Sequence, residues 1–137
     1  MSLVETSCAT AILALAIGGL TNLAATTAAL HQFGVEKSAA VRSIEREIAA
    51  IVASDFTKLT ANWNGAGFAV QLEGTTGKGL VAQKGDADKL PGSVIVTAPT
   101  GDASELVEIE VRVDWVCKHG PTSLVRRVQL SRLGSGS

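Results

Sequence analysis

The 137-residue sequence contains no tyrosine, three phenylalanines and two tryptophans. So few aromatic rings exclude a protein that conducts electrons along stacked side chains. The two cysteines, Cys8 and Cys117, are too few for a disulfide framework, and one lies in an apolar stretch while the other lies far along the chain. We expect both to be free thiols, so cysteine usage does not indicate a cellular compartment.

Groups for acid–base catalysis and metal binding are also scarce. His31 and His119 are isolated, without a second acid or base at motif spacing. Asp86 and Asp88 lie in a loop-like stretch and could offer oxygen ligands to calcium, although a solvated loop is the simpler interpretation. We predict that the chain is not an enzyme and that it holds no cofactor or metal ion.

The net charge of −1 and the pI near 6.1 exclude a global attraction to nucleic acid. A local patch of positive charge near the C-terminus could still contact DNA. Its members are Lys118, Arg126, Arg127 and Arg132. Since no aromatic residue between 118 and 132 could stack on bases, a solvated surface is the preferred interpretation.

Charged residues are missing from one long stretch, because Thr6 to Val35 contains no Asp, Glu, Lys or Arg. About 20 apolar residues suffice to cross a bilayer, and residues 9–30 meet that length with only Thr and Asn as polar interruptions. A domain of this size could hardly surround so long an uncharged helix with its own residues. We therefore expect residues 1–30 to form a hydrophobic helix half buried in a membrane or in the core of an assembly.

Glu5 is the single acid ahead of this stretch. A carboxylate at the edge of a hydrocarbon segment costs several kcal/mol unless it is paired or protonated. The first cation is Lys37, about 48 Å away along a helix, and the Lys or Arg that usually opens a cleavable signal peptide does not precede the stretch. The cation that remains available to Glu5 is an α-amino group, either that of the same chain or that of a neighbouring copy. The alternative is that Glu5 stays solvated at the membrane surface.

Met1-Ser2-Leu3-Val4-Glu5 followed by a charge-free helix resembles the start of a mature type IV pilin or type II secretion pseudopilin, with its leader removed. The resemblance implies that Met1 is an N-methylated N-terminus, although the family usually has Phe there. It implies that Glu5 pairs with the N-terminal amine of an adjacent subunit. It also suggests Gly18-Gly19 as the place where the helix loosens on assembly, while close helix packing by small residues explains these glycines equally well.

The remaining sequence predicts an α+β fold in which a long, pilin-like N-terminal helix packs against a small antiparallel β-sheet head. Residues 31–54 have a helical period with one apolar stripe, so the helix should run from Ser2 to about Ala53. Residues 55–137 should form the β-rich head. Predicted strands lie at 67–72, 79–83, 93–98 and 106–117, followed by a turn at 118–122 and a returning strand at 123–133.

The resemblance implies a structural subunit that polymerises with copies of itself into an extracellular filament of bacteria. Before assembly the subunit would lie in the inner membrane, and a prepilin peptidase and the pilus assembly machinery would act on it. One alternative is a minor pseudopilin of a type II secretion system, since the VxVxW hairpin at 111–115 is similar to those heads. Another is a single-pass, membrane-anchored binding module that never polymerises.

Overall fold

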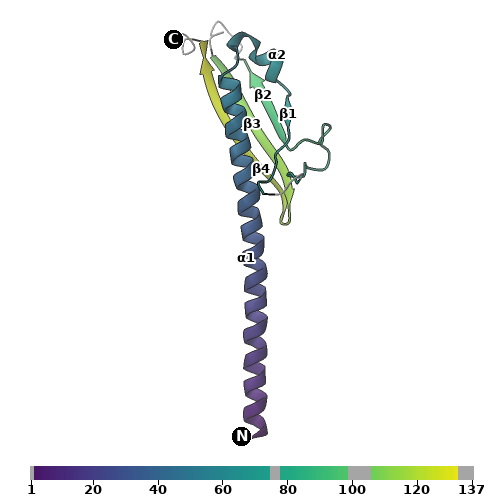
Figure 1. Cartoon of the computed structure of the whole chain (residues 1–137). Coiled ribbons are helices and arrows are strands. Elements are labelled where there is room, and N and C mark those ends of the chain that lie inside the picture. The colour runs from purple at the N-terminus through teal and green to yellow at the C-terminus, as the bar shows by residue number, and fades with distance from the viewer. Residues whose placement is uncertain (1, 75–77, 99–105, 133–137) are drawn as a thin grey trace. The chain divides into compact units, whose positions relative to one another are not determined.

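The computed structural model describes residues 2–74, 78–98 and 106–132 (Figure 1). It confirms the predicted α+β class, a long N-terminal helix with an antiparallel sheet packed against it. The elements in chain order are α1 (Leu3–Val52), η1 (Phe56–Lys58), α2 (Leu59–Trp63), β1 (Gly67–Phe68), β2 (Gly92–Thr97), β3 (Leu106–Cys117) and β4 (Gly120–Ser131). Contacts divide the chain into unit 1, Met1–Gly34, and unit 2, Val35–Ser137. Most of the amphipathic helix half thus belongs with the head.

The four strands are all antiparallel and follow the order β1-β2-β3-β4. β3 alternates as its sequence predicts, since every second residue from Val107 to Trp115 is buried. These side chains meet the inner residues of β2 and one stripe of α1, which together form the core of unit 2. The stripe of α1 contributes Ala39, Ala40, Ile44 and Ile51.

Small residues let α1 lie close to the sheet. Ala40 is fully buried, and the buried Ser43 lies on the same face of the helix. Ile44 and Ile51 then fill the remaining space at 2% and 1% exposure. Burying side chains of this size stabilises the packed state by about 1.5–3 kcal/mol each, so the stripe fixes the helix on the sheet.

β4 begins earlier than predicted, at Gly120, and the predicted turn shrinks to Lys118-His119. The turn predicted at 118–122 included Pro121, because glycine and proline are typical turn residues. In the structure Val116, which faces Pro121, donates its N–H to the Val81 carbonyl at 3.0 Å, away from β4. The missing N–H of Pro121 therefore falls on the open edge of β4, where it costs no ladder bond.

The predictions for the other strands were mixed. The strand predicted at 93–98 matches β2, whereas 67–72 contains only the two-residue β1 and one isolated bridge, Gln71 to Gly79. The strand predicted at 79–83 is wrong, because that stretch makes only isolated bridges, including Ala82 to Trp115. Part of the strand predicted at 123–133 falls on Leu133, outside the described residues. The short helices η1 and α2 were missed because three and five residues are too few to show a period.

Candidate assembly site

Glu5 sits in the first turn of α1 and is exposed. Its backbone N–H donates to the Ser2 hydroxyl at 3.4 Å, and its carboxylate accepts from the Ser2 N–H at 3.4 Å. This reciprocal pair is a capping box, whose sequence signal, Ser followed three residues later by Glu, our sequence analysis missed. Glu5 therefore has a structural role at the helix start, where its charge also favours the helix dipole. Met1 lies outside the described residues.

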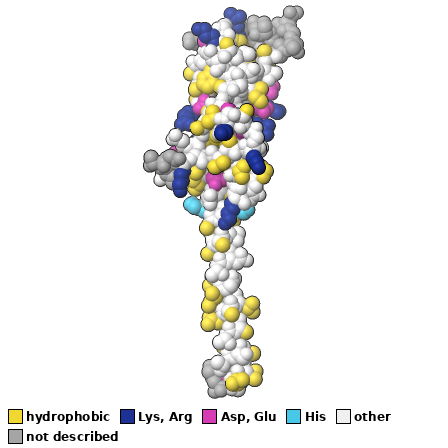
Figure 2. Space-filling model, turned by 90° about the vertical axis from the view of Figure 1, so that its right-hand side faces the viewer, with side chains coloured by type: hydrophobic (Ala, Val, Ile, Leu, Met, Phe, Trp, Pro, Cys, Tyr) yellow, Lys and Arg dark blue, Asp and Glu magenta, His cyan; other side chains and the backbone are white. Residues whose placement is uncertain are grey.

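The part of α1 that belongs to unit 1 is apolar and uncovered. Within α1 lies a stretch long and apolar enough to cross a membrane, and none of its most apolar window is buried within the chain. Leu13, Leu20 and Leu30 each expose 60% or more of their surface. Figure 2 shows apolar side chains along this part of α1 and charged side chains over unit 2. A core helix of a soluble protein would be mostly buried, and exposed apolar surface of this extent is typical of a segment that contacts a membrane or another protein.

Gly18 and Gly19 lie in regular helix within α1. A Cβ added at either position would meet no described atom within 4 Å. The chain itself therefore does not use the space that the two missing side chains leave. A second helix could approach the backbone closely at this point.

At the start of unit 2, α1 is joined to β3 through a buried carboxylate. The Trp115 ring nitrogen donates to Glu36 Oε2 at 3.2 Å, and the two residues are 1% and 8% exposed. Glu36 is a charged residue outside the apolar stripe of residues 31–54, and a charged face turned to solvent was expected there, which is wrong for Glu36. The sequence feature that could have indicated this burial is Trp115 near the end of β3. Its ring N–H is a donor from which a buried carboxylate can accept a hydrogen bond.

One flank of α1 in unit 2 borders a polar hollow of about 610 Å³. Arg42 and Arg46 project into it from α1, and Glu73 lines it from the loop after β1. Arg42 makes an ion pair with Glu73, and both side chains are exposed. The hydrogen bond and the charge of Glu73 raise the pKa of the Arg42 guanidinium. We name Arg42, Arg46 and Glu73 the arginine flank.

The other flank of α1 borders an open groove of about 450 Å³ beside β4. Ile48, Val52 and Val128 give the groove apolar walls. Glu45 from α1 and Arg126 from β4 are its charged members. We name Glu45 and Arg126, with these walls, the glutamate flank.

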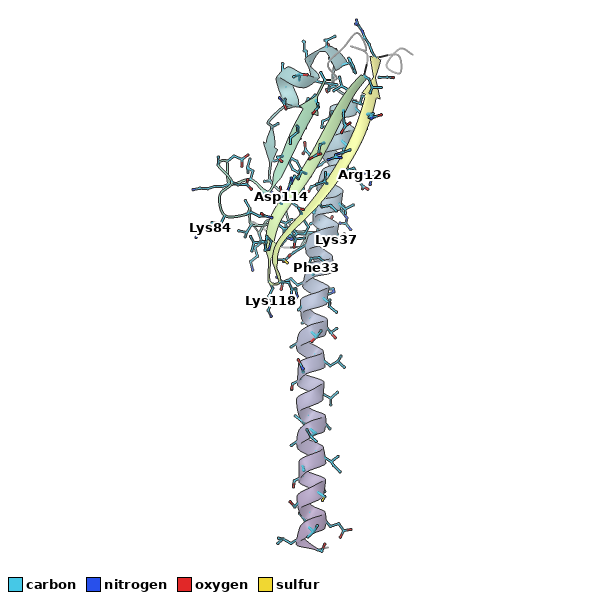
Figure 3. The ribbon with its side chains drawn as sticks, turned by 180° about the vertical axis from the view of Figure 1, so that it is seen from behind. Phe33, Lys37, Lys84, Asp114, Lys118 and Arg126 are labelled. Carbon is cyan, nitrogen blue, oxygen red and sulfur yellow. The ribbon has the colours of Figure 1, made fainter. Side chains whose placement is uncertain are left out.

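The four basic residues considered for DNA do not form one patch. Arg126 pairs with Val111 and lies on the helix-facing side of the sheet, whereas Arg127 lies on the other side with its Nε 2.7 Å from Glu110. Lys118 lies in the turn before β4 and Arg132 follows its end, which separates them by about 40 Å of strand. Figure 3 shows Lys118 and Arg126 well apart along the hairpin.

The candidate calcium ligands and the two cysteines do not form a site in the described residues. Asp86 and Asp88 are exposed in the loop before β2, and Asp88 Oδ1 accepts the Leu90 N–H at 3.1 Å. No group of three or more His, Cys, Asp or Glu residues suited to a metal ion occurs in the described ranges. Cys8 and Cys117 are both free thiols, as predicted.

Comparisons with family models, with curated proteins and with solved structures found no match to this chain.

Proposed function

We propose that the chain is a structural subunit of a type IV pilin-like filament and polymerises with copies of itself through its hydrophobic N-terminal helix. The supporting observation is the apolar segment of α1, none of whose most apolar window the chain buries. An exposed apolar surface of this extent is typical of a membrane or protein contact. A filament subunit has both in turn: lipid before assembly, and the helices of other copies afterwards.

The position of Glu5 supports assembly through electrostatic pairing. Lys and Arg are absent between Glu5 and Lys37, so no side chain of the apolar segment can neutralise this carboxylate. In an apolar surrounding an unpaired charge is strongly unfavourable, and the N-terminal amine of an adjacent copy is the partner that an assembly supplies. We infer that Met1 provides this amine and is N-methylated after a prepilin peptidase removes a leader.

The capping box favours a second candidate, a membrane-anchored module that does not polymerise, because helix capping alone explains an acid at position 5. The two possible roles of Glu5, charge pairing with a neighbouring copy and capping of its own helix, differ in the effect of Glu5→Gln. Glutamine also serves in a capping box, so this variant keeps the cap and removes the charge. Glu5→Ala removes both.

The test is the amount of filament sheared from cells that express each variant, measured against total subunit. If charge pairing drives assembly, Glu5→Gln and Glu5→Ala both reduce sheared filament at least tenfold. If Glu5 only caps the helix, Glu5→Gln assembles like the wild type, and the pairing role is overturned. Mass spectrometry of the N-terminal peptide completes the test. An N-methylated Met1 in sheared material supports the filament subunit, whereas an unmethylated Met1 found only in membranes supports the anchored module.

A minor pseudopilin of a secretion system differs from a major pilin in abundance. A major subunit makes up most of the protein in isolated filaments, whereas a minor one is a small fraction of it. Quantifying this chain in sheared filaments by mass spectrometry separates the two.

A further inference from the structure

We propose that neighbouring copies pack side by side through the two flanks of α1 in unit 2, with Glu45 of one copy entering the hollow beside Arg42 and Arg46 of the next. This inference rests on the proposed function, because it requires copies that share one orientation. It adds the surfaces through which the heads meet.

The arginine flank has two positive charges and one negative charge, so one arginine lacks an acidic partner within the flank. Glu73 makes its ion pair with Arg42. Arg46 is exposed, lines the same hollow and forms no ion pair among the described residues. The hollow of about 610 Å³ is large enough to admit a carboxylate side chain from another copy. The partner that this flank fits is therefore an acid.

The glutamate flank offers such an acid. Glu45 is exposed at the edge of the groove, and none of the ion pairs found in the described ranges includes it or Arg126. The surrounding walls are apolar, and Val52 exposes 54% of its surface. An apolar groove with one acid and one arginine fits a protein surface that carries the opposite charges beside its own apolar atoms.

The two hollows share no lining residue, and they meet along the exposed face of α1, where Arg42 and Glu45 are neighbours one turn apart. Glu45 and Arg46 are consecutive, so their side chains leave α1 about 100° apart. Copies that share one orientation and are related by rotation about an axis contact each other through two different surfaces, one on each side of the subunit. The glutamate flank of one copy then meets the arginine flank of the next. Glu45 faces Arg46, and Arg126 faces Glu73.

These ion pairs would determine how neighbouring copies are aligned more than how tightly they bind, since exposed ion pairs contribute little energy individually. Reversal of one charge has a larger effect than its removal, because it brings like charges together at every contact of the filament. The variants to compare are Glu45→Arg and Arg46→Glu, expressed singly and together in the same cells. Lys58→Glu is the matched control, because Lys58 is an exposed cation in η1 that lines neither flank.

We expect each single reversal to lower sheared filament at least tenfold while the purified full-length subunit keeps the wild-type circular dichroism spectrum. Co-expression of the two single variants restores filaments in which the variants alternate. At one contact the arginine introduced in the first variant faces the glutamate introduced in the second, and at the next contact the native Glu45 faces the native Arg46. Lys58→Glu assembles normally.

The inference is overturned if the single reversals assemble like the wild type, or if co-expression restores nothing although both subunits fold. Co-expression that yields discrete pairs of subunits rather than filaments also overturns it, because the flanks would then meet across a two-fold axis. If the wild type itself forms no filament, the proposed function is contradicted, and so is this inference, which depends on it. The wild-type and variant results therefore distinguish the two failures.

Discussion

Glu36 is a carboxylate held in the core of unit 2 at 8% exposure, where Trp115 donates a hydrogen bond to it. A buried acid that loses a donor keeps its desolvation penalty. This contact lies two residues after Gly34, where the division between the two units falls. Glu36 is also the first residue of α1 to be buried.

Trp115→Phe removes this donor and keeps an aromatic ring in the core. We expect it to lower the free energy of unfolding of unit 2 by about 1–3 kcal/mol, measured by urea unfolding of the full chain in detergent. Trp63→Phe is the matched control, since no hydrogen bond to the Trp63 ring nitrogen is found among the described residues. Equal losses in the two variants would mean that the Glu36 contact adds no stability.

Asp55 caps η1 and accepts hydrogen bonds from Thr57, through the hydroxyl at 2.8 Å and the backbone N–H at 3.0 Å. These bonds lower the pKa of Asp55. A carboxyl group whose pKa is lower in the folded state stabilises the fold above its unfolded pKa, near 3.9, and loses this effect as pH falls through the folded value.

Asp55→Asn should therefore make the stability of unit 2 less dependent on pH below about pH 4, whereas the two proteins should show parallel curves above about pH 5. Urea unfolding of both chains over this pH range measures the difference. Thr57→Ala is a useful comparison, because it removes the hydroxyl donor and keeps the backbone donor. Identical slopes in acid for Asp55→Asn and the wild type would contradict the assigned hydrogen bonds.

At the scale of elements, the β3–β4 hairpin depends on one glycine. Gly120 has φ of +119°, a conformation that residues with a Cβ rarely adopt, and an added Cβ would meet no described atom beyond its chain neighbours within 4 Å. Glycine is thus required at position 120 because of its backbone conformation, and not because neighbouring atoms would clash with a side chain. This conformation explains how a turn of only Lys118 and His119 can connect two twelve-residue strands.

Gly120→Ala should destabilise unit 2 by at least about 1 kcal/mol through backbone strain. Hydrogen exchange of the β3 and β4 amides in the full chain measures this loss. Gly34→Ala is the control, because Gly34 is helical and, within the described part of the chain, an added Cβ would meet nothing within 4 Å. Unchanged exchange in Gly120→Ala would show that the turn tolerates a side chain.

β3 and β4 differ in how well their bounds could be predicted from the sequence. β3 was predicted with its bounds, because one buried face makes twelve residues alternate strictly. β4 was misjudged at Pro121, because the direction of the Val116 N–H decides whether proline is tolerated, and only the register reveals it. Of the candidate site, the uncovered apolar helix followed from the sequence. The flanks did not, since they join α1 to segments far away in the chain.

At the scale of the whole molecule, α1 contains a segment long and apolar enough to cross a membrane. We expect Leu20→Arg to reduce the membrane-associated fraction, because an arginine near the centre of a membrane span costs about 2.5–3.5 kcal/mol. Flotation of membranes after alkaline extraction measures this fraction. Ala50→Arg is the matched control, since Ala50 is an exposed residue of the same helix within unit 2. Equal fractions for the two variants would exclude a membrane span in this segment.

The open edge of β4 bears on solubility. A long strand with free backbone groups on one side is a template for aggregation when many copies are held together. Arg126 and Arg127 lie at the centre of β4, one on each face of the sheet. Two copies of β4 that paired along their whole length would bring these arginines within a residue or two of each other, and like charges at that spacing are unfavourable. The arginine pair therefore disfavours edge-to-edge pairing of β4 between two copies of the chain.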